Sequence, residues 1–381
     1  MTRIYLDHAA TTPARAEVVA AMAPLHGGYN PNSLHAEGRA ARAAVDSARE
    51  AVARVLGAAP REIVFTGGGS ESDVLAVAGA ARAATGRGRH VVTVATEHHA
   101  VLHAVDVLER DGWRVTRLPV DARGLVDPNE FAAALTPETT VASVMLANNE
   151  IGVVQPVAEL ARIARERGVL VHTDAVQAAG WLPLHVDALG VDLLTLSGHK
   201  CYGPKGVGVL YVRRGTALEP LIVGGGQEHG LRAGTENVAG IAGFAVALAL
   251  GDSERPDAVV RIGALRDRLE AGIVAAIPDV VVNGAGVPRL ANNLSVAFAG
   301  VPSDAVLIRL DLEGIAASAG SACAAGSLEP SHVAIALGLD ERHRHGVIRF
   351  SLGRDTTPAD IEEVLRRLPS IMASMGTPLV V

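Results

Sequence analysis

The chain has 381 residues, of which 49% are hydrophobic, 20% charged and 3% aromatic, and its formal net charge is −7. This length exceeds what one hydrophobic core usually serves, so we expect two domains, or one large α/β domain with an appendage. The acidic balance and the scattered aromatic residues argue against nucleic acid as a partner, because such proteins need basic faces and stacking platforms.

The two cysteines, Cys201 and Cys323, are too few and too far apart for a disulfide framework. Residues 1–13 carry charged side chains where a signal peptide needs an uninterrupted apolar stretch. The longest apolar run, residues 238–251, is shorter than the roughly 20 residues of a membrane span, and we interpret it as a buried helix. We therefore expect a protein of the reducing cytoplasm that does not bind membranes.

Short β-branched runs alternate with amphipathic, alanine-rich stretches from about residue 35 to residue 250, as is typical of βαβ units and a mostly parallel sheet. This alternation of strands and helices ends near residue 255, where we predict a domain boundary, followed by a smaller α+β domain. The predicted strands are 63–66, 90–95, 114–119, 141–147, 169–173, 191–196 and 207–212, followed by apolar segments at 280–283 and 293–299 and a strand at 347–352. The predicted helices are 70–84, 100–110, 156–167, 257–276, 303–312 and a closing helix after residue 358.

Polar residues follow five of the predicted strands, at the edge where open parallel sheets bind their ligands. We therefore expect these five clusters to converge on one rim. They are Gly67-Gly-Gly-Ser70-Glu-Ser72, Thr96-Glu-His98-His99, Asn148-Asn149-Glu150, His172-Thr-Asp174-Ala-Val-Gln177 and Ser197-Gly-His199-Lys200.

Residues of these clusters can be interpreted either as parts of a binding site or as ordinary structural features. Glycines 67–69 fit a phosphate cradle before a helix, although such a run also forms a simple tight turn. Lys200, after a buried strand, has the setting of an imine-forming lysine, whereas most lysines are solvated surface charges. Asp174 needs a cation if buried, such as a protonated pyridine nitrogen, or else it caps the next segment. In this chain order the clusters together describe a pyridoxal phosphate site.

The chain resembles the cysteine desulfurase family, within the class V aminotransferases of fold type I. The resemblance implies a large pyridoxal phosphate-binding domain over residues 15–255 with a mostly parallel seven-stranded sheet. It also implies a smaller α+β domain, over residues 1–14 and 256–381, that carries a catalytic cysteine loop. The motifs run from end to end: Tyr-Leu-Asp-His-Ala-Ala-Thr-Thr-Pro (5–13), Asn30-Pro-Asn-Ser-Leu-His35, Ser-Glu-Ser-Asp (70–73), Thr96-Glu-His-His99, Asn148-Asn-Glu-Ile-Gly152, Ser197-Gly-His-Lys200, Arg232-Ala-Gly-Thr-Glu-Asn-Val238, Ser318-Ala-Gly-Ser-Ala-Cys323 and Ile348-Arg-Phe-Ser-Leu-Gly-Arg354.

The same resemblance implies pyridoxal 5′-phosphate as cofactor, L-cysteine as substrate and a homodimer with shared active sites. Its catalytic residues are Lys200, which binds the cofactor covalently, His98, which stacks on the ring and handles protons, and Cys323, which accepts the sulfur. Arg349 binds the substrate carboxylate, because a planar guanidinium can donate two parallel hydrogen bonds to a carboxylate, and Asn149 lies close to it. The implied cofactor contacts are Lys200, Asp174, Gln177, His98, Gly69, Ser70, Asn149, Ser197, His199 and, reaching the neighbouring subunit, Thr235.

Cys323 stands in Ser-Ala-Gly-Ser-Ala-Cys-Ala-Ala-Gly-Ser, which is nearly free of bulky side chains. Taken alone, such a cysteine is more often a small buried hydrophobe, but its place in the family motif implies a thiolate that becomes a persulfide. A sulfur-acceptor protein would then discharge it, in iron–sulfur cluster assembly, RNA thiolation or a specialised pathway. Cys201, next to Lys200, is interpreted as a packing residue whose side chain points away from the lysine.

The residues alone are also compatible with two other functions. One is a pyridoxal-dependent carbon–sulfur or selenocysteine lyase or an aminotransferase, in which Cys323 is incidental. Another is a cofactor-free scaffold, against which the presence of Lys200, Asp174 and His98 argues. His99 and His103 have the spacing of a metal pair on a helix, but no third ligand lies nearby in the sequence, so we expect no metal site.

Overall fold

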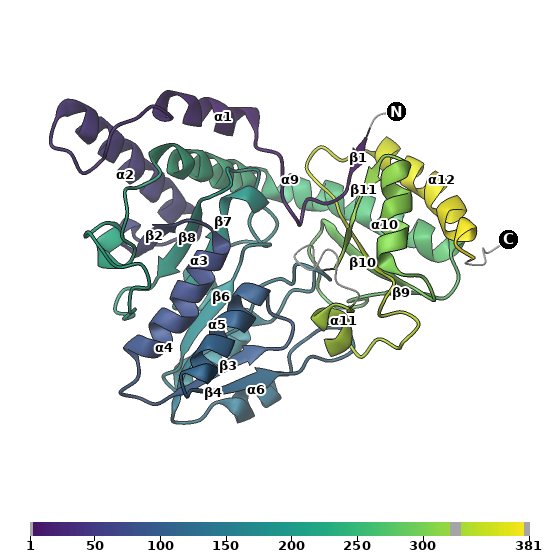
Figure 1. Ribbon diagram of the computed structural model, residues 1–381, viewed down its shortest axis with the longest axis horizontal. Coiled ribbons are helices and arrows are strands. Elements are labelled where there is room, and N and C mark those ends of the chain that lie inside the picture. The colour runs from purple at the N-terminus through teal and green to yellow at the C-terminus, as the bar shows by residue number, and fades with distance from the viewer. Residues whose placement is uncertain (1–2, 321–328, 377–381) are drawn as a thin grey trace.

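The computed structural model describes residues 3–320 and 329–376, so Cys323 lies outside the described residues. Figure 1 shows two lobes side by side, with one long helix, α9, running from the first into the second. The first lobe contains the large sheet and the helices that cover it. The N-terminal strand β1 lies in the second lobe, among segments from the C-terminal third of the chain.

A seven-stranded sheet in the order β2-β8-β7-β6-β5-β3-β4 forms the centre of the first lobe. Neighbouring strands are parallel except for β8, which runs antiparallel to β2 and to β7. This confirms the predicted α/β class with a mostly parallel sheet. The strands are β2 (Ile63–Thr66), β3 (His90–Val94), β4 (Arg114–Leu118), β5 (Thr139–Ser143), β6 (Leu170–Asp174), β7 (Leu193–Ser197) and β8 (Gly208–Val212).

Helices cover this sheet because apolar side chains recur every three or four residues along them, as at Ala41, Val45, Ala48 and Val52. The predicted helix over 70–84 is one helical stretch, made of α3, η3 and α4, with a π-helical turn in the middle. The helical elements are α1 (Ala16–Met22), η1 (Ala23–Leu25), α2 (Ala36–Leu56), η2 (Pro60–Glu62), α3 (Gly69–Val74), η3 (Leu75–Gly79), α4 (Ala80–Ala83), α5 (His99–Arg110), α6 (Pro128–Ala134), α7 (Val157–Glu166), α8 (Val186–Leu189), η4 (Gly198–Lys200) and η5 (Glu228–Gly230).

The second lobe is built on a four-stranded antiparallel sheet in the order β12-β13-β10-β9. Strand β1 pairs in parallel with β11, which joins the N-terminal residues to this lobe. The strands are β1 (Ile4–Tyr5), β9 (Val280–Val282), β10 (Asn293–Phe298), β11 (Ile315–Ala316), β12 (Ser318–Ala319) and β13 (Val347–Ser351), and the helices are α10 (Ser303–Leu312), α11 (His332–Ala336) and α12 (Pro358–Ser374).

Helix α9 (Val238–Ala276) unites two predicted elements, the apolar run 238–251 and the helix 257–276. The prediction that they are separate is wrong, because Pro256 lies inside the helix without ending it. The first half of α9 packs into the core of the large lobe through Phe244, and the second half packs into the second core through Leu269. The boundary near residue 255 therefore falls within a continuous helix, and the domain division stays a prediction.

Although α9 has 39 residues, its second half is rich in charged side chains. None of the helices in the described part of the chain is long and apolar enough to cross a membrane. Strand ends differ from the prediction by a few residues, as at β5, which ends at Ser143 rather than at residue 147. Ends of this kind fray, and the main-chain hydrogen bonds to β6 continue as far as Leu146.

Candidate active site

A cavity of about 250 Å³ lies at the carboxyl ends of strands β2, β3, β5, β6 and β7. All five predicted polar clusters contribute to its wall, so the structure brings them together on one rim. Two side chains of the second lobe, those of His332 and Arg349, also line the cavity. The predicted site residues in the wall are Gly69, Ser70, His98, Asn149, Asp174, Gln177, Ser197, His199, Lys200 and Arg349, and the others include Asp73, His99, Glu150 and His332.

Two predicted site residues are not part of this wall. Thr235 is exposed and lies outside the residues that line the cavity. Arg232, three residues before it, forms an ion pair with Glu71 of the same chain (2.9 Å). The predicted contact of Thr235 with a neighbouring subunit stays a prediction, as does every role assigned to Cys323.

Lys200 ends the short turn η4, directly after β7, and its amine reaches the cavity. Its Nζ donates hydrogen bonds to the carbonyl oxygens of Ala9 (2.6 Å) and Ala10 (2.9 Å). Gln177 Nε2 donates to the same Ala9 oxygen (3.0 Å). The N-terminal segment thus crosses from the second lobe and orients both side chains.

Cys201 points in a different direction from Lys200. Its side chain belongs to the core of the large lobe, and burial raises the pKa of its thiol to about 12. A thiol with this pKa carries almost no thiolate at neutral pH and is a poor nucleophile. The structure therefore places Cys201 where a packing residue is expected.

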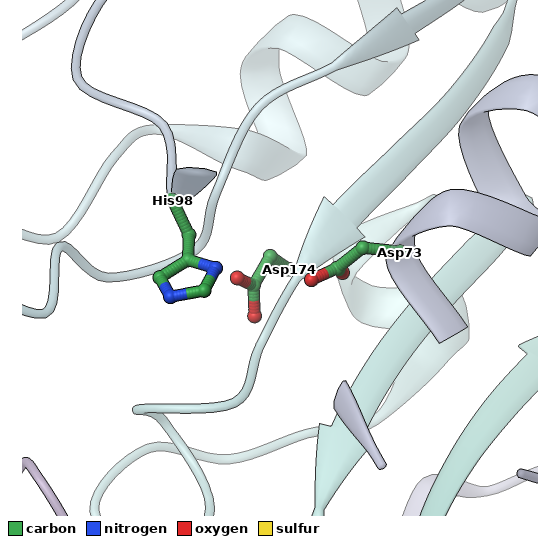
Figure 2. Close-up of side chains that lie close together, drawn as sticks. All are labelled: Asp73, His98 and Asp174. Carbon is green, nitrogen blue, oxygen red and sulfur yellow. The ribbon is translucent and has the colours of Figure 1, made fainter. Parts of the chain in front are cut away.

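Asp73, His98 and Asp174 converge on one point, with ligating atoms within 4.8 Å of one another (Figure 2). Burial raises the pKa of Asp174 to about 6, although Lys200 and a hydrogen bond from the N–H of Val176 (2.9 Å) act in the opposite direction. Burial and the nearby Asp174 carboxylate raise the pKa of Asp73 well above its usual range. The Oδ1 atom of Asp73 has no hydrogen-bond partner among the described residues.

Two buried carboxyl groups with an orphaned oxygen are stabilised either by protonation or by a cation that offsets their charge. The spacing suits a metal ion, and it equally suits a protonated pyridine nitrogen. The primary amine of Lys200 in the same cavity and the phosphate cradle described next favour the pyridine. The residues present therefore fit pyridoxal phosphate, with Asp174 as the group that would pair with its ring nitrogen.

A second hollow, of about 480 Å³, adjoins the cavity behind the glycine loop. Gly68 has φ 155° and ψ −178°, a conformation that only glycine adopts readily. A Cβ atom at Gly208 would lie 2.6 Å from the carbonyl carbon of Gly68, so the glycine loop and strand β8 approach as closely as glycine permits. Thr11, Ser70, Ser197, His199 and Lys205 line the hollow and offer hydroxyl, imidazole and ammonium donors of the kind that a phosphate group requires. Glu71 also lines it, and its carboxylate is paired with Arg232.

Arg349, on β13, is 2% exposed and supplies a guanidinium group to the cavity. Its Nη2 donates to Asp7 Oδ1 (2.9 Å), and its Nη1 donates to the carbonyl oxygens of Asn149 (2.8 Å) and Gly320 (3.2 Å). Its buried Nε has no acceptor among the described residues. The protein thus fixes the guanidinium in place and leaves a donor for a carboxylate ligand.

Four histidines gather around the start of α5. Burial, and then the Lys200 cation, lower the pKa of His98 to about 4. The rings of His99 and His103 stack with centroids 5.3 Å apart, and the ring of His332 lies 4.7 Å from that of His99. A third histidine, distant in the sequence, thus lies beside this pair because α11 packs close to the start of α5, and the expected absence of a metal site stays a prediction.

Sequence reasoning also missed three buried acids of this region, Asp73, Glu97 and Glu150. Glu97 Oε1 accepts a hydrogen bond from the N–H of Met145 (2.6 Å), and Glu150 Oε2 accepts one from the Ser331 hydroxyl (2.5 Å). Burial raises the pKa of both glutamates. Glu97 and Glu150 belong to the polar clusters that follow strands, and Asp73 comes directly after another, so an acidic residue within a few positions of a strand end was the available signal.

The raised pKa of Asp174 predicts a pH-dependent effect on stability in the cofactor-free protein. Because the folded state binds this proton more tightly than the unfolded state, the contribution of Asp174 to stability falls as the pH rises from the ordinary value of 3.8 through about 6. We expect Asp174→Asn to gain free energy of unfolding relative to the wild type across this window. Urea unfolding of both cofactor-free proteins from about pH 4 to pH 7 measures the difference, and a difference independent of pH would contradict the assignment.

Comparison with known proteins supports the same assignment. The family described as aminotransferase class-V matches residues 4–364. A relative named cysteine desulfurase IscS, from Dictyoglomus turgidum, is 48% identical over 376 residues, which are 98% of this chain and 95% of the relative. A solved structure described as a NifS-like protein has a TM-score of 0.91 and 36% identity, and the match covers 98% of this chain and 100% of that one. A structure of SspA in complex with cysteine has a TM-score of 0.82 and 36% identity, with 93% and 100% covered.

These likenesses extend over nearly the whole chain and confirm the predicted fold type I. They agree with a site that combines a cavity lysine, a buried aspartate and a glycine-bound phosphate hollow. The chain thus belongs to the cysteine desulfurase family of class-V aminotransferases, whose members depend on pyridoxal 5′-phosphate.

Proposed function

We propose that the protein converts L-cysteine into L-alanine and transfers the sulfur to Cys323 as a persulfide. The observation that carries this proposal is the conjunction in one cavity of the Lys200 amine, the buried Asp174 and the Arg349 guanidinium. The adjoining glycine-lined hollow supplies the phosphate site. The names of the relatives support the choice of reaction.

When bound, pyridoxal phosphate supplies an electron sink for bonds at the Cα and Cβ atoms of an amino acid. Lys200 would hold the cofactor covalently, and Asp174 would pair with the ring nitrogen, which would also offset the buried carboxyl charge. His98 and Gln177 would hold the ring. The loop at Gly69 and the side chains of Ser70, Ser197 and His199 would bind the phosphate.

Arg349 binds the substrate carboxylate through the guanidinium donors that the protein leaves unused. Asn149, whose carbonyl oxygen accepts from Arg349, lies beside the same carboxylate. A fixed guanidinium would orient the amino acid within the cavity that Lys200, Glu150 and His332 also line.

Cys323 acts as the nucleophile in the sulfur transfer. Its thiolate forms a bond to the substrate sulfur, and the bond between that sulfur and the substrate Cβ breaks. The electron pair of the broken bond stays with the carbon skeleton, which leaves as alanine after it takes up protons. The enzyme retains the sulfur as a Cys323 persulfide, and a sulfur-acceptor protein must remove it before the next turnover.

A homodimer with shared active sites is part of the proposal. Asn32 donates to Glu236 (2.9 Å), which ties together two segments of the large lobe. One of them exposes Tyr29 (60%) and Leu34 (90%), and the other exposes Thr235. Apolar side chains beside an exposed polar residue with a predicted cofactor role support a subunit interface at this surface.

We further propose that the protein works in the cytoplasm and serves iron–sulfur cluster assembly or a related sulfur pathway. The support is the reducing environment that a persulfide carrier needs and the relatives' name IscS. We retain the division into a domain of residues 15–255 and a domain of residues 1–14 and 256–381, because each lobe has its own core.

Product analysis tests the proposed reaction. With L-cysteine and a thiol reductant, we expect alanine and sulfide to form in equal amounts, because the carbon skeleton keeps its amine. Formation of pyruvate with ammonia would instead indicate a lyase, and an oxo acid would indicate an aminotransferase. Either outcome would contradict the proposal.

A further inference from the structure

His332, the first residue of α11, lines the cavity although it comes from the second lobe. Its Nε2 atom lies 2.9 Å from the carbonyl oxygen of Glu97. Because a carbonyl oxygen can only accept a hydrogen bond, Nε2 must carry a proton. A neutral His332 therefore has its lone pair on Nδ1.

The Nδ1 atom of His332 is available to a ligand. Within residues 3–320 and 329–376, no group forms a hydrogen bond with it. Burial and the neighbouring His103 lower the pKa of His332, so the ring is neutral at pH 7. The wall of the cavity thus presents an unprotonated ring nitrogen whose tautomer is fixed by the backbone.

His98 has the opposite tautomer. Its Nδ1 accepts a hydrogen bond from the N–H of Ala100 (3.1 Å), so a neutral His98 carries its proton on Nε2. In that form it has no lone pair left for a ligand. Of the two histidines, His98 can donate a hydrogen bond to a ligand, and His332 can accept a proton from one.

The start of α11 is adjacent to the place where the substrate carboxylate is proposed to bind. Ser331, immediately before His332, donates to the Glu150 carboxylate (2.5 Å). Asn149, immediately before Glu150, accepts from Arg349 (2.8 Å). Arg349 and His332 are therefore linked through the contacts of Asn149, Glu150 and Ser331, and both line the cavity.

We propose that His332 is the base that removes the proton from the thiol of the bound substrate. The S–H bond breaks, a new N–H bond forms at Nδ1, and the electron pair stays on sulfur. The resulting imidazolium is stabilised by its other hydrogen bond, to the Glu97 carbonyl oxygen, and later releases its proton to solvent. This role rests on the proposed function, since it requires a thiol substrate in this cavity.

The groups packed around His332 set the pH range in which it works. On the α5 side, His103 disfavours a charge on the His332 ring, and His332 in turn lowers the pKa of His98 and of His99. Glu97 contributes its carbonyl oxygen. Glu150, whose pKa burial raises, lies behind Ser331 and is partly offset by Arg349.

The test compares His332→Gln with the wild type. A glutamine amide can still donate to the Glu97 oxygen but has no basic nitrogen, and His185→Gln, at an exposed position away from the cavity, is the matched control. Without the base, the reaction depends on thiol that has ionised by itself, with a pKa of about 8.5. We expect kcat/KM for L-cysteine to fall about thirtyfold at pH 7, and to recover as the pH approaches 9.

A second readout needs neither cofactor nor turnover. In the cofactor-free protein labelled with ¹⁵N-histidine, we expect the ring signals that vanish in His332→Gln to show a proton on Nε2 and none on Nδ1. A proton on Nδ1 would overturn the inference.

The kinetic outcomes separate the inference from the proposed function. An unchanged pH profile in His332→Gln, or a loss that is the same at every pH, would overturn the role of His332 alone. A control variant that behaves like His332→Gln would do the same. A wild-type protein that forms no alanine from L-cysteine would overturn the proposed function, and this inference with it.

Discussion

Replacing Cys323 by serine is expected to abolish sulfide release from L-cysteine while leaving the visible absorbance of the bound cofactor intact. A serine hydroxyl cannot form the sulfur–sulfur bond on which the transfer depends, and it is not ionised at neutral pH. We expect turnover to fall by roughly three orders of magnitude or more, as when other enzymes lose their nucleophile. Sulfide and alanine assays on the cofactor-loaded variant measure the loss.

The chain offers a matched control for this experiment, since it has only one other cysteine. Cys201 is buried in the core, and its pKa of about 12 keeps it in the unreactive thiol form. Cys201→Ala is therefore expected to retain sulfide release. Full activity in Cys323→Ser, or loss of activity only in Cys201→Ala, would contradict the assignment of the sulfur carrier.

Replacing Lys200 by alanine is expected to remove both the covalent attachment of the cofactor and the activity. The Lys200 amine is held at the cavity wall by the carbonyl oxygens of Ala9 and Ala10, next to the carboxyl group proposed to face the ring nitrogen. We expect desulfuration to fall by roughly three orders of magnitude or more. The absorbance band of the covalently bound cofactor should also be absent.

Lys205 makes this prediction unusually easy to check, because the chain contains only two lysines. After borohydride reduction of the loaded protein, peptide mapping should find the added cofactor mass on Lys200 and not on Lys205. Lys205→Ala should keep the covalent band and lose only part of the affinity for the phosphate group, since Lys205 lines the phosphate hollow. Cofactor mass on Lys205 would contradict the assignment.

Much of the fold could be predicted from local pattern. Apart from the edge strand β4, the strands of the large sheet are short β-branched runs that are buried along almost their whole length. The exception is α9, where Asp252, Glu254 and Pro256 looked like a boundary. Packing on both cores overrides that local signal, because a helix buried at Phe244 and again at Leu269 stays continuous between them.

The site residues also include some that could be located from the sequence and some that could not. Residues that directly follow a strand, such as Asp174 and Lys200, could be located from the sequence because the sheet itself brings strand ends together. His332 follows no strand of the large sheet. Its position depends on how α11 packs against the start of α5, through its hydrogen bond to the Glu97 carbonyl oxygen. A contact between lobes of this kind has no periodic or local signature.

The most direct test of the account is to locate the sulfur after a single turnover. The loaded protein is mixed with L-cysteine in the absence of a reductant, its thiols and persulfides are alkylated, and its peptides are analysed by mass spectrometry. We predict one added sulfur atom on the peptide that contains Cys323, together with one equivalent of alanine. Alanine and free sulfide formed while Cys323 stays unmodified, or an added sulfur on Cys201 instead, would contradict it.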